Sequence, residues 1–432
     1  MAPRRTVSLA MLSVLLLAPG RVEPQERKTL SQCIDLALRQ QPTLKASAAS
    51  VEAARDRVWQ STASYLPQVT ANYSAVRRKA SAGSLTGSFS TGQSRTFNFY
   101  STGAQLSQVL FDFGQNLALI HAAEASAASA AADADTQHDT VVFDVSQSYF
   151  GLLAAYRLRD VADETVTQNE KHLELAQGRF DVGLAPKFDV TQAQVQVASA
   201  ELNQVTARNN VSLGRETLRN ALGLSAPLDF DIVDVLVEPP AAIDDAEALT
   251  FAYDNRPELR GIRAQEDAAA QRTAALERDY LPKVTGNAAY NWSGTTYPLR
   301  DTWSLGVGVN LSVFNGGLTT AQVSEARANL KNLQASEEAL RQSIMLEVRQ
   351  AVLNVHQAVE SIRVADKGLE QARENVELAE GRYAAGVGTI IELTDAQTSL
   401  VSAKASRVQT LVSYHTALAS LERAAAHRFT AD

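Results

Sequence analysis

Four segments of the chain alternate apolar and polar side chains with a period of two residues. They occur as two pairs, 68–76 with 96–111 and 283–292 with 303–314. This period places successive side chains on opposite faces of a strand. The sequence therefore predicts four strands, each with one apolar and one polar face.

Helical periodicity fills most of the remaining chain. Residues 115–181 contain no proline and few glycines, which predicts one helix about 100 Å long at 1.5 Å per residue. A second helix of the same length is expected to end at Arg382. Each is followed by a tight turn and a returning helix, at 186–222 in the first case and ending near His427 in the second.

Shorter helices are expected before each strand pair, at 30–64 and 247–279, where Pro42 and Pro257 kink or split them. Corresponding residues lie 215 positions apart before the strands and 203 positions apart after them. The difference falls in the loop between the strands, expected at 77–96 in the first unit, where insertions are tolerated. The chain is therefore predicted to be internally duplicated.

The N-terminus has the pattern of a secretory signal. Arg4 and Arg5 precede an apolar run that is too short to span a bilayer as a helix. A short strand is expected at Phe230–Val237. The expected organisation is a signal peptide (1–24), a first structural repeat (25–227), a connector (228–245), a second structural repeat (246–428) and a C-terminal tail (429–432).

Composition excludes several classes of function. The net charge is −8, which leaves no basic face for nucleic acid. The six histidines lack the spacing of a metal site, and Met345 is the one methionine after the expected signal, so no metal and no cofactor are expected. The sequence shows no arrangement of a nucleophile and a base that would indicate an enzyme. The single Cys33 is expected to be a small apolar residue on a helix face, because it lies too far from the leader for a lipid anchor.

Four strands are too few to enclose a lumen, and a sheet in lipid cannot keep open edges. The expected fold is an α+β membrane protein: a trimeric 12-stranded β-barrel with four strands from each protomer, continued by a long α-helical coiled-coil barrel. The alternative is a soluble periplasmic coiled-coil scaffold with a small β cap. Aromatic residues toward the strand ends favour the membrane protein: Tyr73, Tyr100, Tyr290, Trp292 and Trp303.

The two long helices end in related tips. Residues 179–194 read RFDVGLAPKFDVTQAQ and residues 382–397 read RYAAGVGTIIELTDAQ. In each, an aromatic residue precedes a glycine turn, and an acid follows in the first turn of the returning helix. The strand exits also correspond, as Phe-Asp-Phe-Gly at 111–114 and Phe-Asn-Gly-Gly at 314–317.

In the order and spacing of these motifs the chain resembles the TolC family of outer-membrane efflux channels, over essentially the whole mature sequence. The resemblance implies a homotrimer in the outer membrane of a Gram-negative cell, in contact with outer-membrane lipid and extending into the periplasm. It implies a periplasmic adaptor (membrane fusion) protein and an inner-membrane pump such as an RND or ABC transporter. The implied function is the exit duct of a tripartite efflux or type I secretion system, gated at its periplasmic tips.

The resemblance also implies roles for tip residues. Asp189 corresponds to the gate acid of the first hairpin, and Tyr383 to the tyrosine that helps lock the closed state. Glu392 and Asp395 correspond to acids that line the constriction, where a ring of acids attracts cations. The basic residue of the family's lock would stand at Gly388 and is missing.

Helix capping is an alternative explanation for two of these acids. Thr389 and Glu392 have the spacing of a capping box, and Asp189 lies in a first helical turn, where the macrodipole favours an acid. Lys187 is a candidate to replace the missing basic residue. The resemblance places adaptor docking at four turn residues, for which turn chemistry is the alternative: Gly183, Leu184, Gly386 and Val387.

Overall fold

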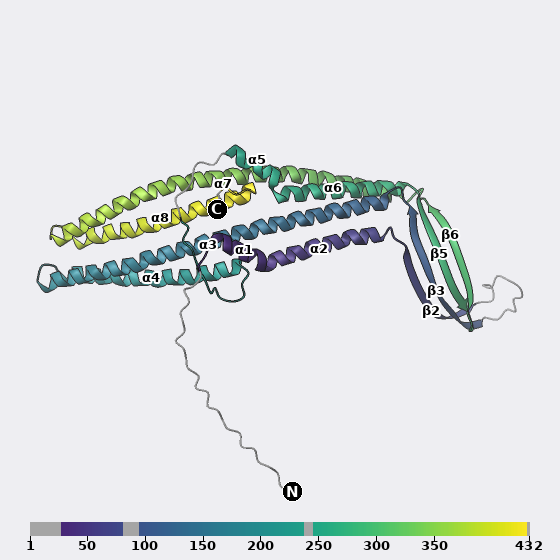
Figure 1. The fold of residues 1–432 in the computed structure, drawn as a ribbon, viewed down its shortest axis with the longest axis horizontal. Coiled ribbons are helices and arrows are strands. Elements are labelled where there is room, and N and C mark those ends of the chain that lie inside the picture. Colours follow the sequence, from purple (N-terminus) through teal and green to yellow (C-terminus); the bar gives the residue numbers. More distant parts are fainter. Residues whose placement is uncertain (1–26, 81–94, 237–244, 430–432) are drawn as a thin grey trace, which may run out of the picture.

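The computed structural model describes residues 27–80, 95–236 and 245–429. It is an elongated molecule with a sheet at one end and two helical hairpin tips at the other (Figure 1). The expected signal peptide and residues 430–432 of the expected tail lie outside the described residues. So do 81–94 of the expected loop and 237–244 of the connector.

Two helices of 67 residues, α3 (Gln115–Asp181) and α7 (Leu318–Ala384), run the length of the helical part (Figure 1). The prediction of two equally long helices is confirmed, although the second ends at Ala384. Within the described ranges, no helix combines the length and apolarity needed to cross a membrane. Four shorter helices flank the long ones, two on the sheet side and two on the tip side: α2 (Pro42–Ala63), α6 (Pro257–Glu277), α4 (Lys187–Ala221) and α8 (Ile390–Ala425).

Both prolines split their helices. Pro42 begins α2 and Pro257 begins α6, at the first helical position, where the missing N–H has no intrahelical partner to lose. The preceding helices are therefore separate, α1 (Leu30–Gln40) and α5 (Asp245–Asn255). A short 3₁₀ helix, η1 (Arg278–Tyr280), follows α6.

The expected connector strand, Phe230–Val237, is much shorter than predicted. Within its described part, residues 230–236, only β4 (Asp231–Ile232) forms, paired in parallel with β1 (Arg27–Lys28). The Asp234 carboxylate then accepts a hydrogen bond from the backbone N–H of Leu236. This local turn uses the backbone that a longer strand would need.

The main sheet is antiparallel, in the order β2-β3-β5-β6, so β2 and β6 are its edges. Its strands are β2 (Gln68–Ala80), β3 (Arg95–Phe111), β5 (Lys283–Gly294) and β6 (Arg300–Asn310). All four predicted strands are confirmed, but several bounds were wrong: β3 begins one residue earlier than predicted, β5 ends at Gly294, and β6 begins at Arg300, in the region predicted to be a loop. Residues 77–80 continue β2 because they pair with 95–98, and β6 stops at Asn310 because its partner Lys283 is the first residue of β5.

Strand register aligns the apolar residues in rows across one face of the sheet. One row is Val69, Leu106, Ala288 and Leu305, and the next is Ala71, Ala104, Tyr290 and Trp303. Leu305 is 78% exposed and Trp303 is 73% exposed. A single chain therefore presents a broad apolar face. The opposite face is polar, and at Gly103 a Cβ would lie 2.1 Å from the Asn291 Oδ1, so only glycine fits there.

The core lies in the helical part. One cluster joins α3 to α1 and α4 around Tyr149 and Leu218, and another joins α7 to α5 and α8 around Val352 and Leu421. Cys33 is fully buried in the first cluster, as expected of a small apolar residue, and burial raises the pKa of its thiol to about 11. A third, small cluster lies in the second tip.

We predict that Gly223→Ala lowers the apparent melting temperature of the helical part by several degrees. Gly223 has a φ of +70°, and a Cβ there would lie 2.7 Å from the Gln41 Cα, which costs about 1–3 kcal/mol. Circular dichroism during heating measures the change. Gly368→Ala is the control: a Cβ at this helical glycine meets nothing within 4 Å, and alanine stabilises a helix by about 1 kcal/mol. Equal melting of the two variants would contradict the prediction.

Candidate functional site: the hairpin tips

Both tips turn through the same backbone motif. In the first tip, the N–H groups of Gly183 and Leu184 donate to the carbonyls of Phe180 and Arg179. The second tip repeats both bonds 203 residues later, with Gly386 in the place of Gly183. The two glycines have φ values of +77° and +75°, the left-handed conformation that this helix ending requires. Turn chemistry therefore accounts for both glycines.

A cluster of three side chains joins the two hairpins. The Tyr383 hydroxyl donates to the Asp189 Oδ2 at 3.2 Å. The Arg179 Nη1 donates to the backbone oxygens of Tyr383 at 2.7 Å and Ala384 at 2.9 Å. Its guanidinium also lies 5.0 Å from the centroid of the Tyr383 ring, within range of a cation–π interaction. Helices α3, α4 and α7 each contribute one residue to this tip cluster of Arg179, Asp189 and Tyr383.

Tyr383 is the buried centre of the tip cluster. It is 2% exposed and packs with Val376 and Leu393. Burial, and then the charge and hydrogen bond of Asp189, raise the pKa of the Tyr383 phenol to about 12, with Arg179 opposing the shift. The protonated phenol is the hydrogen-bond donor. Its contribution is therefore complete below the ordinary tyrosine pKa near 10 and is lost as the pH rises through about 12.

The acids of the second tip have a different environment. The Glu392 Oε2 lies 3.4 Å from the Arg382 Nε, and both side chains are about half exposed. The Thr389 hydroxyl accepts from the Glu392 N–H at 3.2 Å. The Glu392 carboxylate faces Arg382, so only one of the two bonds of the expected capping box forms. Asp395 is exposed, and its carboxylate has no partner within the described chain.

The cation of the tip cluster was not identified from the sequence. A Cβ at Gly388 would lie 3.0 Å from the Arg382 Cβ and 3.2 Å from its carbonyl carbon, so a basic side chain does not fit there without movement. Lys187 is exposed and takes no part in the tip cluster. Arg179 supplies the positive charge. The duplication contained the signal, because Arg179 and Arg382 precede the aromatic residues of the two tips at equivalent positions.

Further contacts join the first hairpin to the second above the tips. The His172 Nε2 on α3 lies 3.5 Å from the Glu380 Oε1 on α7, and the Lys404 Nζ on α8 lies 2.7 Å from the Glu164 Oε2 on α3. Burial lowers the pKa of the His172 imidazole. These contacts, like those of the tip cluster, must break if the hairpins separate.

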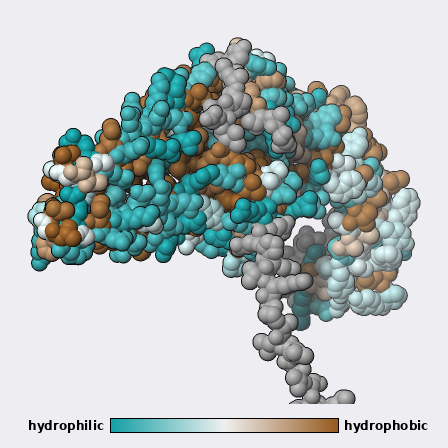
Figure 2. All heavy atoms as spheres, turned by 60° about the vertical axis from the view of Figure 1, so that its left-hand side comes forward, coloured by the Kyte–Doolittle hydropathy of each residue, from teal (hydrophilic) through white to brown (hydrophobic). Residues whose placement is uncertain are grey.

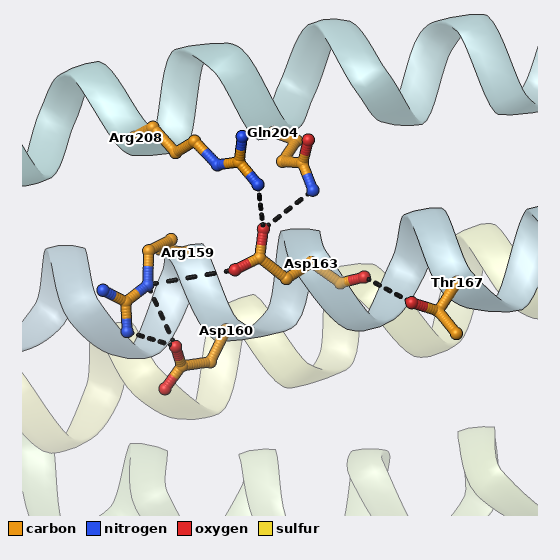
Figure 3. A network of polar contacts seen from close by, with 6 residues as sticks. All are labelled: Arg159, Asp160, Asp163, Thr167, Gln204 and Arg208. Atoms are coloured by element: carbon orange, nitrogen blue, oxygen red, sulfur yellow. Dashed lines mark hydrogen bonds and ion pairs between the residues drawn. The ribbon is translucent and has the colours of Figure 1, made fainter.

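A separate polar network holds α3 against α4 within the first hairpin (Figure 3). The Asp163 Oδ1 accepts from the Gln204 Nε2 at 2.8 Å and from the Arg208 Nη2 at 3.4 Å. Arg159 approaches the other carboxylate oxygen of Asp163 and binds Asp160. These contacts help α3 and α4 to remain paired while the tip cluster holds the hairpins together.

The turn residues proposed for docking form an apolar surface at the ends of the hairpins. Leu184 is 71% exposed and Val387 is 69% exposed. Apolar surface is visible at the left-hand end of the molecule in Figure 2, where the tips lie. The glycines are required by the backbone conformation of the turns, and the exposed apolar residues beside them are accessible to a partner.

The aromatic residues expected at the membrane interface also occupy one surface. Register places all five on the apolar face of the sheet: Tyr73, Tyr100, Tyr290, Trp292 and Trp303. The ring centroids of Tyr290 and Trp292 lie 4.6 Å apart, and those of Tyr100 and Tyr297 lie 5.2 Å apart. Tyr297 lies in the loop between β5 and β6 and was not among the predicted aromatic residues. In the part of the chain that the structure describes, no cluster of His, Cys, Asp and Glu could hold a metal ion.

Comparison with known proteins identifies the family. The profile of the outer membrane efflux protein family matches residues 33–224 and 249–427, which together form most of the chain. The chain belongs to the outer membrane efflux protein family. It is a protein of the Gram-negative outer membrane, and the family consists of channel proteins rather than enzymes.

Individual members of this family are distant in sequence. Outer membrane protein TolC of Salmonella enteritidis is 26% identical over 399 residues, which cover 88% of this chain and 78% of that protein. The toluene efflux pump outer membrane protein TtgF of Pseudomonas putida is 25% identical over 381 residues, covering 87% and 78%. The chain thus aligns with efflux proteins across both of its halves.

Solved structures of outer-membrane channels have the same fold. The channel OprN superposes with a TM-score of 0.80 at 20% identity, covering 92% of this chain and 89% of that one. The CmeC channel of Campylobacter jejuni gives 0.79 at 18% identity, covering 100% and 96%. At these identities the likeness shows the fold alone.

We predict that Arg179→Met increases hydrogen exchange at the second tip. Loss of the charged hydrogen bonds to two carbonyls costs about 1.5–3 kcal/mol, so the amides of Gly386 and Val387 should exchange roughly tenfold faster or more. Exchange measured by mass spectrometry on the detergent-solubilised protein tests this. Arg208→Met is the control, because Arg208 contacts Asp163 away from the tip. Unchanged exchange at residues 385–388 would contradict a structural role for Arg179.

Proposed function

We propose that three copies of this chain form the exit duct of a tripartite efflux or type I secretion system, closed at rest by the periplasmic tips. The observation that carries the proposal is the tip cluster. It ties the two hairpins together at the free end of helices about 100 Å long. The chain is an efflux protein by family, and this cluster gives it an element that can open and close.

The open edges of a single chain support a trimer. Among the strands that the structure describes, β2 and β6 each have a partner on one side only, and three four-stranded sheets would give a closed 12-stranded barrel. The helices have matching open faces. On α4, Phe188, Val195 and Leu202 are exposed at seven-residue spacing, and on α7 Leu346 and Leu353 are exposed at the same spacing. This is the pattern of a coiled-coil seam between copies.

We assign the tip residues as follows. Asp189 and Tyr383 form the closing contact, with Arg179 holding the end of α7. Glu392 and Asp395 face the constriction, and threefold symmetry turns them into rings that attract cations. Gly183, Leu184, Gly386 and Val387 form the docking surface for a periplasmic adaptor, which connects to an inner-membrane pump of the RND or ABC type. The two repeats, 25–227 and 246–428, then each provide one hairpin of the gate, after removal of the signal peptide (1–24).

Planar-bilayer conductance, with the oligomer mass measured on the same detergent-solubilised sample, tests this function. A trimer with small, cation-selective currents is the expected result. A monomer that stays soluble without detergent and gives no currents would support the soluble periplasmic coiled-coil scaffold instead.

We predict that Tyr383→Phe and Asp189→Ala each increase the single-channel conductance. Both remove the same hydrogen bond, so the double variant should exceed either single variant by little. Tyr414→Phe, at a buried tyrosine of α8 outside the tip cluster, should leave conductance unchanged. Fully additive effects of the two tip substitutions would show that the residues act separately.

We predict that Glu392→Gln combined with Asp395→Asn weakens the block of the channel by multivalent cations. Six carboxylates leave the constriction of the trimer, so the concentration for half-block should rise by about tenfold or more. Current recordings at increasing cation concentration measure this. Glu338→Gln, an exposed acid elsewhere on α7, is the control for the general loss of charge. Unchanged block would mean that both acids act only at the start of α8 and do not affect cations in the channel.

A further inference from the structure

The apolar face of β2 ends in two cations. Residues two apart on a strand point to the same side, so Arg77 and Lys79 continue the face that carries Val69 and Tyr73. Arg78 points to the opposite side, where its guanidinium lies 5.1 Å from the centroid of the Phe99 ring. All three basic residues fall in the loop expected at 77–96, where the directions of their side chains would not be defined. The strand register defines them.

The length of β2 indicates where these cations would lie relative to a lipid bilayer. A tilted strand needs about 9–11 residues to cross the hydrocarbon core of a bilayer. Counted from Gln68, where β2 leaves the helical part, this distance ends near Arg77. Tyr100, with Tyr297 beside it, pairs with Ala75 two residues before Arg77, and Tyr73 lies two residues further back. Interfacial aromatic residues mark the border of the hydrocarbon, so Arg77 and Lys79 lie beyond it. Arg77 and Lys79 are thus at the height of lipid headgroups, at the end of the sheet away from the helices (Figure 1).

The sheet offers these cations no counterion. Their partners across the strand pair are neutral, Asn98 opposite Arg77 and Thr96 opposite Lys79. The four strands contain one acid, Asp301, and it accepts a hydrogen bond from the Tyr290 hydroxyl at 3.0 Å. Both cations are exposed and form no ion pair with a described residue. An anion from outside the chain would complete the site.

We propose that Arg77 and Lys79 bind the phosphate groups of glycolipid headgroups in the outer leaflet of the outer membrane. Two cations about 7 Å apart on one face can contact one phosphorylated headgroup together, with the arginine fork donating two hydrogen bonds to phosphate. The apolar rows on the same face cover its acyl chains. The proposal rests on the proposed function, because it requires the sheet to cross the membrane.

The matched control is on the same strand. Arg77→Gln and Lys79→Gln each remove one charge from the lipid-facing side, and Arg78→Gln removes one charge from the opposite side. Binding of diphosphoryl lipid A to the purified protein in neutral nanodiscs is titrated by native mass spectrometry, at low and high salt. We expect Arg77→Gln and Lys79→Gln each to weaken binding by roughly fivefold and to reduce its salt dependence, whereas Arg78→Gln leaves both unchanged.

Three results would overturn the proposal. Equal weakening by all three variants would indicate a general effect of net charge. Equal binding of diphosphoryl lipid A and its phosphate-free analogue would show that phosphate is not recognised. Lower heat resistance of the trimer in Arg77→Gln and Lys79→Gln, with unchanged lipid binding, would assign the cations to the neighbouring copy's edge strand.

A separate measurement distinguishes failure of this inference from failure of the proposed function. Flotation with vesicles of neutral phosphatidylcholine tests whether the sheet inserts into a bilayer at all. A protein that does not insert contradicts the duct. A protein that inserts and conducts, but shows no preference for phosphorylated lipid, contradicts only the headgroup site.

Discussion

The free edges of the sheet impose the strongest constraint on this chain. β2 and β6 each present a row of backbone N–H and C=O groups without a strand partner, and hydrocarbon offers these groups no hydrogen bonds. In the proposed trimer, closure by further copies would satisfy both edges at once. It would also fix the rotation between copies, so that the exposed seven-residue stripes of α4 and α7 could meet. The strand register would then set the arrangement of the tips, at the far ends of helices about 100 Å long.

The tip cluster depends on divergence between the two repeats. Phe180 and Tyr383 occupy equivalent positions, as do Asp189 and Glu392. The combination of the second tyrosine with the first acid gives the side-chain hydrogen bond of the tip cluster, which crosses between the hairpins. Phe180 has no hydroxyl to donate, and Glu392 is engaged by Arg382. The duplicated backbone therefore supplies two hairpins of equal length, and side chains that differ between the repeats supply the Tyr383–Asp189 contact between them.

Much of the fold could be predicted because its signals are periodic. Alternation identified every strand of the main sheet, and the absence of proline identified both 67-residue helices. The predictions failed where a residue's structure depends on a segment far away in the sequence. Residues 77–80 look like a loop in sequence but are a strand because β3 extends beside them. Arg179 binds carbonyls that lie 204 and 205 positions away, and no local pattern records such a contact.

The sheet shows the same divergence as the tips. At the offset of 215 positions, Arg77 and Lys79 correspond to Trp292 and Gly294, where β5 ends. Strand β2 of the first repeat thus continues with cations beyond its aromatic residue Tyr73. Strand β5 of the second repeat has the aromatic Trp292 at the position of Arg77 and ends two residues later. A strand that served only to close a barrel would gain nothing from this extension. Together with the neutral partners of both cations, the difference between repeats favours a specific contact at the membrane surface over a general preference for charge outside the bilayer.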